Sequence, residues 1–175
     1  AVASGPIVRG EADYLNVLDE LVALSKANGA YTLLVYRYGE PNADLVAMPD
    51  QEAINAMAIL AARYVNEPAV LYGLQVEALD TSWTTLKPLY VQMIDTIRAV
   101  HPRSLIFVPG TVWSRYIYWA IDDPINRPHL VWKTHPYDSW STIQASYRLD
   151  QVSASFPVLL GEFGPGAFMS QADVD

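Results

Sequence analysis

The chain contains no cysteine, and its 11 Lys and Arg face 19 Asp and Glu, which gives a formal net charge of -8 at pH 7. The missing cysteines exclude disulfides, thiol catalysis and cysteine metal sites. The acidic balance argues against a nucleic-acid partner, because a phosphate-binding protein needs a basic face. Neither absence decides the compartment, since a chain without cysteine suits a cytosolic protein as well as an exported one.

A long apolar run is also lacking. The longest, residues 56–62, is far too short to span a bilayer, and no Lys/Arg-rich segment offers a contact for an anionic membrane. We therefore expect no membrane partner. The first ten residues have neither the basic start nor the apolar core of a signal peptide, so the localisation stays unknown.

What the chain does contain is a regular alternation of helix and strand patterns. Its 175 residues, 51% of them hydrophobic, can bury one sizeable core. No repeat, low-complexity tract or linker interrupts residues 1–175, so we expect one domain or part of one. The predicted elements, in chain order, are helix 11–28, strand 31–37, helix 51–65, strand 69–76, helix 86–100, strand 104–108, helix 114–124, strand 129–134, helix 141–154 and strand 157–163.

Near-continuous apolar strands between helices predict an α/β fold with a parallel sheet. A doubly wound sheet is disfavoured, because no glycine-rich phosphate turn follows the first strand. In a (β/α)8 barrel of the TIM type, functional residues gather at the C-terminal ends of the strands. Polar or aromatic groups end four strands here, at residues 37–38, 77, 135–137 and 162, so the barrel is favoured.

The strand count falls short of a full barrel. Five strands are predicted, whereas an eight-stranded barrel typically needs about 250 residues. About two strands are expected to be missing at the start and one at the end, whether the chain is a piece of a longer protein or a truncated barrel. Five strands alone expose two apolar edges, which invites self-association or pairing with the missing segments.

Two of the strands end on a carboxylate. Glu77 follows the run AVLYGLQV and Glu162 follows FPVLLG. Ionised carboxylates are costly to bury, so two such strand ends indicate two acids aimed into one site. Hydrolysis of a glycosidic bond needs this pair, one proton donor and one nucleophile or base. The alternatives are a Glu that caps a loop and a Glu in a solvated loop.

The residues at the strand ends resemble those of the cellulase-like glycoside hydrolases of family 5, which are retaining (β/α)8 barrels. In that family the fourth strand ends in Asn-Glu-Pro, the sixth leads to His-x-Tyr and the seventh ends in a Gly-Glu-Phe-Gly type motif. This chain has residues 76–78, 135–137 and 161–164 at these places. Val76 replaces the Asn, and Tyr38 stands where the family has a His. The similarity covers about residues 11–166.

The resemblance implies about five of the eight βα units, no cofactor, a carbohydrate substrate and a secreted or extracellular protein. It implies Glu162 as the nucleophile and Glu77 as the acid and then the base of a retaining hydrolase of β-linked polysaccharides or oligosaccharides. A carbohydrate-binding remnant without catalysis and an inert structural piece stay open as alternatives. Val76 favours slow or absent hydrolysis, because its side chain offers the sugar no hydrogen-bond donor.

The remaining candidates are expected to contact the sugar. His135 and Tyr137 are expected to bind sugar or carboxylate, and Tyr38 lies at a strand end. Ordinary packing is the alternative for each of the tryptophans, and a metal site is disfavoured because the chain has only three histidines. The tryptophans predicted in loops after strands, where a flat ring can stack on a pyranose, are Trp83, Trp113 and Trp140.

Overall fold

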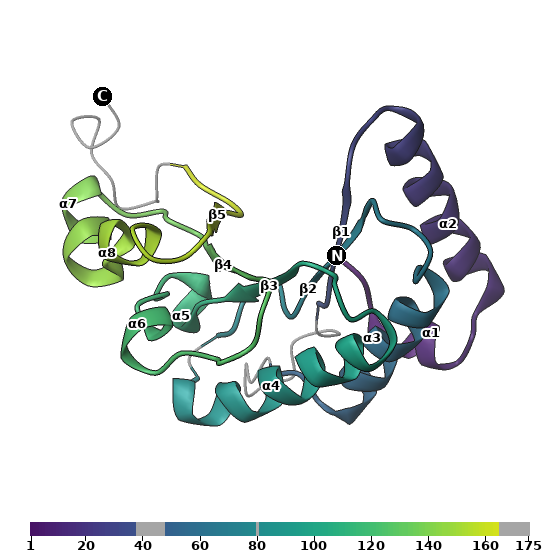
Figure 1. The fold of residues 1–175 in the computed structure, drawn as a ribbon, viewed down its shortest axis with the longest axis horizontal. Helices are drawn as coiled ribbons and strands as arrows, with labels where there is room; N and C mark the ends of the chain where they lie inside the picture. Colours follow the sequence, from purple (N-terminus) through teal and green to yellow (C-terminus); the bar gives the residue numbers. More distant parts are fainter. Residues whose placement is uncertain (38–47, 80, 165–175) are drawn as a thin grey trace.

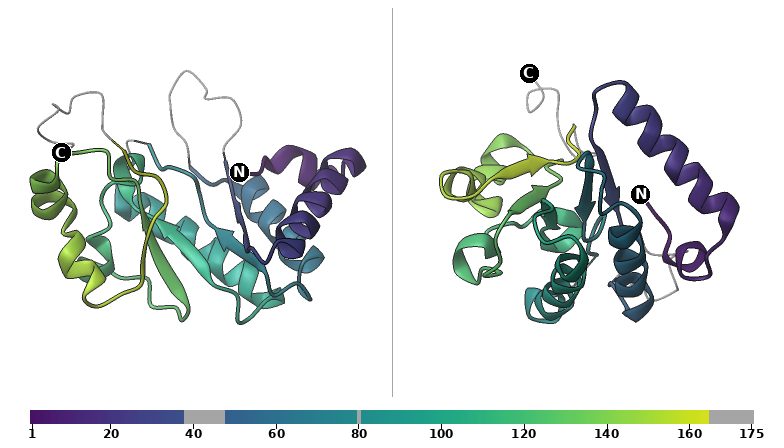
Figure 2. Two further views of the ribbon diagram at one scale, coloured as in Figure 1. Left: turned by 90° about the horizontal axis from the view of Figure 1, so that it is seen from above. Right: turned by 45° about the vertical axis from the view of Figure 1, so that its right-hand side comes forward.

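The computed structural model describes residues 1–37, 48–79 and 81–164 (Figure 1). Its centre is a five-stranded parallel sheet in the order β1-β2-β3-β4-β5. The sheet curves like one side of a barrel, and the helices gather on its outer face (Figure 2). The predicted parallel α/β arrangement is confirmed.

All five predicted strands are present, and they are shorter than their apolar runs. The last three residues of the predicted strand 69–76, for example, are irregular chain after Gly73. The helices and strands are α1 Ser4–Val8, α2 Ala12–Ala27, β1 Thr32–Val35, α3 Gln51–Arg63, β2 Val70–Gly73, α4 Trp83–Val100, β3 Ile106–Pro109, α5 Thr111–Ser114, α6 Trp119–Asp122, β4 Leu130–Thr134, α7 Trp140–Thr142, the π-helix Ile143–Tyr147, α8 Leu149–Ser153 and β5 Val158–Leu160.

The core lies between the sheet and helices α3 and α4. Each of these helices begins at a side-chain cap: Asp50 accepts a hydrogen bond from Ala53 N, and Ser82 accepts one from Thr85 N. The Ser82 cap starts α4 at Trp83, three residues before the predicted start. Fully buried side chains of this core are Met57, Leu60, Tyr72, Leu86, Met93, Ile94, Ile97, Ile106 and Val108.

Two predicted helices differ from expectation. Predicted helix 114–124 is helical mainly at α6, and the chain before it, in α5, makes a tight turn in which Val112, Trp113 and Ser114 have left-handed φ of 50°, 60° and 59°. Helix 141–154 is divided, because Arg148 has φ 55°. Consecutive left-handed residues cannot continue a right-handed helix.

The start of the chain adds to the first edge of the sheet. Val2 N donates to Val35 O at 2.7 Å, and Arg37 N donates to Val2 O at 2.9 Å, as a neighbouring parallel strand would. Val2 is buried there. Residue 2 therefore occupies the position of one further strand beside β1.

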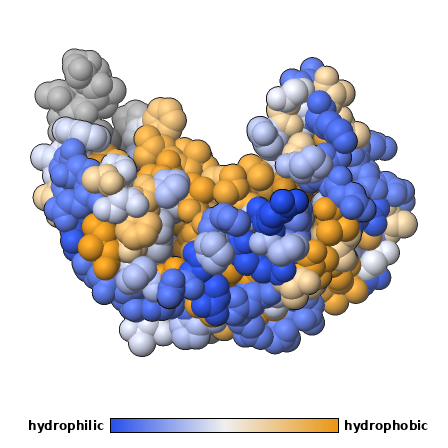
Figure 3. Space-filling view, in the orientation of Figure 1, coloured by the Kyte–Doolittle hydropathy of each residue, from blue (hydrophilic) through white to orange (hydrophobic). Residues whose placement is uncertain are grey.

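The inner face of the sheet is open. β3 is buried throughout, but β1 and β5 are only partly buried, although their sequences predict fully buried strands. Figure 3 shows the resulting hollow, lined by hydrophobic surface between two arms of the molecule. Within the described ranges, no helix has both the length and the apolar character required to cross a membrane.

Candidate active site

A cavity of about 500 Å³ lies on the inner face, where the C-terminal ends of the strands meet. Its apolar wall is Leu33, Val35, Val76 and Leu159, and its polar wall is Arg37, Glu77, Lys133, His135 and Glu162. Parallel strands place their carboxyl ends at one edge of the sheet, so residues distant in sequence line one space. Glu77, His135 and Glu162 were predicted from the sequence to share such a space.

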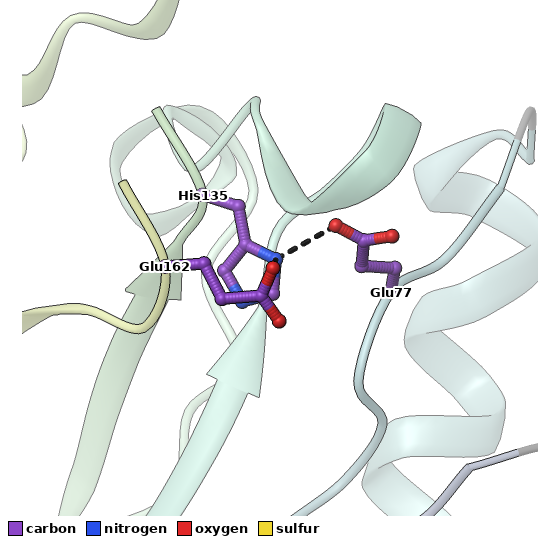
Figure 4. Close-up of side chains that lie close together, drawn as sticks. All are labelled: Glu77, His135 and Glu162. Carbon is purple, nitrogen blue, oxygen red and sulfur yellow. Dashed lines mark hydrogen bonds and ion pairs between the residues drawn. The ribbon is translucent and has the colours of Figure 1, made fainter. Parts of the chain in front are cut away.

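The carboxylates of Glu77 and Glu162 both approach the ring of His135 (Figure 4). Its Nδ1 lies 2.8 Å from Glu77 Oε1 and 3.8 Å from Glu162 Oε2. The imidazole is buried, and its backbone N–H donates to Ser114 O at 3.0 Å. The ring is thereby fixed from both its backbone and its side chain, and Glu77 is oriented toward it.

Glu162 has a second partner in Tyr137, whose hydroxyl donates to Glu162 Oε2 at 2.9 Å. This hydrogen bond raises the pKa of the Tyr137 hydroxyl above its ordinary value, because the phenol is a donor to a carboxylate only while it keeps its proton. The Glu162 side chain is 46% exposed and that of Glu77 21% exposed. Of the two acids, Glu162 is the more open to an incoming molecule.

One carboxylate oxygen of Glu77, one ring nitrogen of His135 and one carboxylate oxygen of Glu162 all lie within 4.8 Å of one another. In the described residues, this is the set of side chains whose donor atoms are close enough to hold a metal ion. The same closeness suits an acid and a nucleophile that act on one bond.

Sequence reasoning missed Lys133. It lies on β4, two residues before His135, so strand alternation turns both side chains to the inner face. The side chain is buried, and Nζ donates to Gln75 O at 3.1 Å and to Val76 O at 2.8 Å. A lysine at the inward position of the apolar strand LVWKT was the signal that could have found it.

The left-handed turn after β3 supports the same strand end. Trp113 N donates to Ala78 O at 2.6 Å, and Ser114 Oγ donates to Val76 O at 3.1 Å. Backbone strain of this kind persists where the surroundings fix it, and it gathers at functional sites. The turn therefore holds the chain on both sides of Glu77.

The prediction that Trp83 stacks on sugar is wrong. Trp83 is the first residue of α4 and is 2% exposed, its ring stacked on Trp119 at 5.9 Å and its Nε1–H donating to Asp123 O. Trp113 and Trp140 are 43% and 64% exposed, and neither lines the cavity. Tyr38 lies outside the described residues.

Comparison with known proteins identifies the family. The family model for cellulase, glycosyl hydrolase family 5, matches residues 2–173. Endoglucanase Z of Dickeya dadantii is 38% identical over 87 residues, which are 49% of this chain and 20% of that protein. Endoglucanase E-5 of Thermobifida fusca is 25% identical over 157 residues, which are 84% of this chain and 33% of that protein.

Solved structures share the fold. The catalytic domain of Thermobifida fusca endoglucanase Cel5A superposes with a TM-score of 0.73 at 23% identity over 89% of this chain and 53% of that one. A β-glucanase from Saccharophagus degradans gives 0.75 at 21% identity over 93% and 56%. The chain thus spans about a third or less of these curated relatives and about half of these solved chains. With its five parallel strands it is a partial TIM barrel, and it belongs to the cellulases of glycosyl hydrolase family 5.

Proposed function

We propose that the protein is a retaining glycoside hydrolase that cleaves β-linked polysaccharides or oligosaccharides of the cellulose type. The observation that carries the proposal is the convergence of Glu77 and Glu162 on His135 in one cavity. The family and the endoglucanase names of the relatives support this substrate class.

In the first step, Glu162 is the nucleophile. One of its carboxylate oxygens forms a bond to the anomeric carbon while the bond from that carbon to the glycosidic oxygen breaks. Glu77 transfers its proton to the departing oxygen. The hydrogen bond from Tyr137 holds Glu162 for the attack and favours its charged form.

In the second step, water enters where the leaving group stood. Glu77, now a carboxylate, takes one proton from the water as its oxygen bonds to the anomeric carbon. The bond to Glu162 breaks, and both residues return to their starting states. Two inversions at one carbon give net retention.

The spacing of the two acids supports retention over inversion. Retaining enzymes hold their carboxyl groups about 5–5.5 Å apart, whereas inverting enzymes need about 6.5–9.5 Å to admit a water. The Glu77 and Glu162 oxygens within 4.8 Å of each other fit the shorter class.

Val76 favours a second candidate function, carbohydrate binding without turnover. The side chain lies on the cavity wall directly before Glu77 and has no group that can donate to a sugar hydroxyl. Titration of cello-oligosaccharides by calorimetry, with analysis of the products, separates the two functions: a binder gives a saturable heat of binding and no shortened products, and a hydrolase releases reducing ends.

The roles are tested by azide rescue in the longest natural polypeptide that contains this sequence. Glu162→Ala should abolish turnover, and azide should restore it with the α-glycosyl azide as product. Glu77→Ala should still react with activated aryl glycosides, far better than with substrates that have poor leaving groups, and azide should then give the β-glycosyl azide.

Glu20→Ala, on the exposed surface of α2, is the matched control and should keep full activity. A Glu77→Ala enzyme whose rate is indifferent to the leaving group would refute the acid role. Products of inverted configuration from the wild-type enzyme would refute the double displacement.

A further inference from the structure

Lys133 reaches from β4 across β3 to the end of β2. Its Nζ donates to the carbonyl oxygens of Gln75 and Val76, at 3.1 and 2.8 Å. These are the two residues directly before Glu77. The Lys133 side chain therefore connects the backbone before Glu77 to β4, the strand that leads to His135.

The stem of Lys133 lies against the segment that carries the second acid. A Cβ added to Gly161 would come within 2.9 Å of both Cγ and Cδ of Lys133, and within 2.9 Å of Nε2 of His135. Gly161 directly precedes Glu162, so the absence of a side chain there lets the lysine stem and the backbone approach closely. The lysine stem therefore packs directly against the backbone that leads into Glu162.

Packing alone does not explain an ammonium at this place. The side chain is 4% exposed, and a methionine of similar size would fill the space without the desolvation of a charge. Burial lowers the pKa of Lys133 to about 8, and the carboxylates of Glu162 and Glu77, which face it, oppose that shift. The amino group thus stands against two backbone carbonyl oxygens, in a cavity that both acids also line.

We propose that Lys133 is a positioning residue that fixes the separation of Glu77 and Glu162, by binding the backbone before the first and by packing under the turn before the second. The inference rests on the proposed function and deepens it. Lys133 itself need touch no reacting atom, because it acts through the two segments that it holds.

The test compares Lys133→Met, which keeps the stem and loses the donors, with Lys133→Arg, which keeps a charged donor. In the longest natural polypeptide that contains this sequence, Lys133→Met should lower kcat by about 10- to 100-fold with little change in KM, since a displacement of about 1 Å can cost 10²-fold. Lys133→Arg should recover most of that loss. Lys26→Met, on the exposed end of α2, is the control and should leave kcat unchanged.

A second readout needs no turnover. In ¹⁵N-histidine NMR, the Nδ1 proton of His135 in its hydrogen bond to Glu77 reports the position of that acid; His101→Gln and His129→Gln assign the signal. Lys133→Met should remove or shift it, and Lys133→Arg should keep it. Lys133→Gln, too short to reach both carbonyls, carries the same expectation as Lys133→Met if the latter does not fold.

The outcomes are distinguishable. An unchanged His135 signal in Lys133→Met, or an unchanged kcat, overturns the positioning role. A wild-type protein without turnover refutes the proposed function, and the NMR comparison then still decides whether Lys133 positions Glu77.

Discussion

Val76 places an isopropyl group on the cavity wall beside Glu77. Alternation along the chain turns the neighbouring Gln75 the other way, where its amide accepts a hydrogen bond from Tyr90 and donates to Glu77 O. Gln75 is thus engaged toward the helices and does not supply the donor that the family's Asn would bring. At the scale of the residue, we propose that this one apolar side chain is what slows hydrolysis.

We predict that Val76→Asn raises kcat by at least tenfold and changes KM less. An amide here can donate to the sugar 2-hydroxyl, and that bond strengthens as the transition state forms. By analogy with an oxyanion donor, the contact is worth roughly 2–4 kcal/mol, or about 10²- to 10³-fold in rate. Steady-state kinetics on cello-oligosaccharides measure it, with Val76→Leu as the control. Brisk wild-type turnover with no gain from Val76→Asn would contradict the prediction.

Lys133 gives a second prediction at this scale, on the pH dependence of stability. The pKa of Lys133 is lowered to about 8 in the folded protein, whereas an unfolded lysine titrates near 10.4. Between these values the unfolded chain binds more protons, so the contribution of Lys133 to the free energy of unfolding rises with pH. The gain is absent below about pH 8 and complete above about pH 10.4.

The measurement is urea unfolding of wild type and Lys133→Met at pH 7, 8, 9 and 10. The difference in free energy of unfolding, wild type minus variant, should increase over this range. A flat difference would show that the lysine titrates normally in the folded protein.

At the scale of the element, the cap of α3 carries a prediction. Asp50 accepts a hydrogen bond from Ala53 N at 2.8 Å, and α3 supplies a large part of the core. Asp50→Ala should lower the free energy of unfolding by about 0.5–2 kcal/mol, whereas Asp50→Asn should lower it less, because Asn also caps well. Thermal and urea unfolding measure both, and equal losses in the two variants would contradict a capping role.

The strands and the pair Glu77 and Glu162 were predictable from sequence, because each strand is an apolar run followed by a chemically distinct residue. Glu77, His135 and Glu162 lie just beyond the C-terminal ends of β2, β4 and β5, and a parallel sheet brings such ends together. The left-handed turn at 112–114 was not predictable, since no glycine marks it and only tertiary contacts hold it.

Side-chain burial was harder to predict than element type. Trp83 is a core residue because the Ser82 cap starts α4 at Trp83, three residues before the predicted start, and the indole stacks on Trp119. In α2, Leu18 and Val22 are buried, whereas Leu21 and Leu24 are 52% and 62% exposed. The apolar face of α2 therefore includes more residues than pack against the rest of the described structure.

At the scale of the whole molecule, the open inner face leads to a prediction about residues 1–175 expressed alone. Leu33, Val35 and Leu159 line the hollow, and β5 is the last strand of the sheet, so its outer edge is open to pairing with another chain. We expect this polypeptide to bind the dye ANS and to self-associate with rising concentration. A longer natural polypeptide that closes the barrel should do neither.

Dye fluorescence and analytical ultracentrifugation measure both properties. Leu33→Lys with Leu159→Lys should reduce dye binding and association, and Leu60→Lys, in the core, should unfold the chain instead. A monomer without dye binding would refute the expectation that this face is free.

The strand order affects when, during synthesis, the residues of the site come together. Each strand pairs with the one made just before it, and a chain leaves the ribosome N-terminus first at about 5–20 residues per second. Every new strand therefore finds its neighbour already synthesised. Glu77 emerges well before Glu162, so the two proposed catalytic acids can face each other only after β5 has joined the sheet.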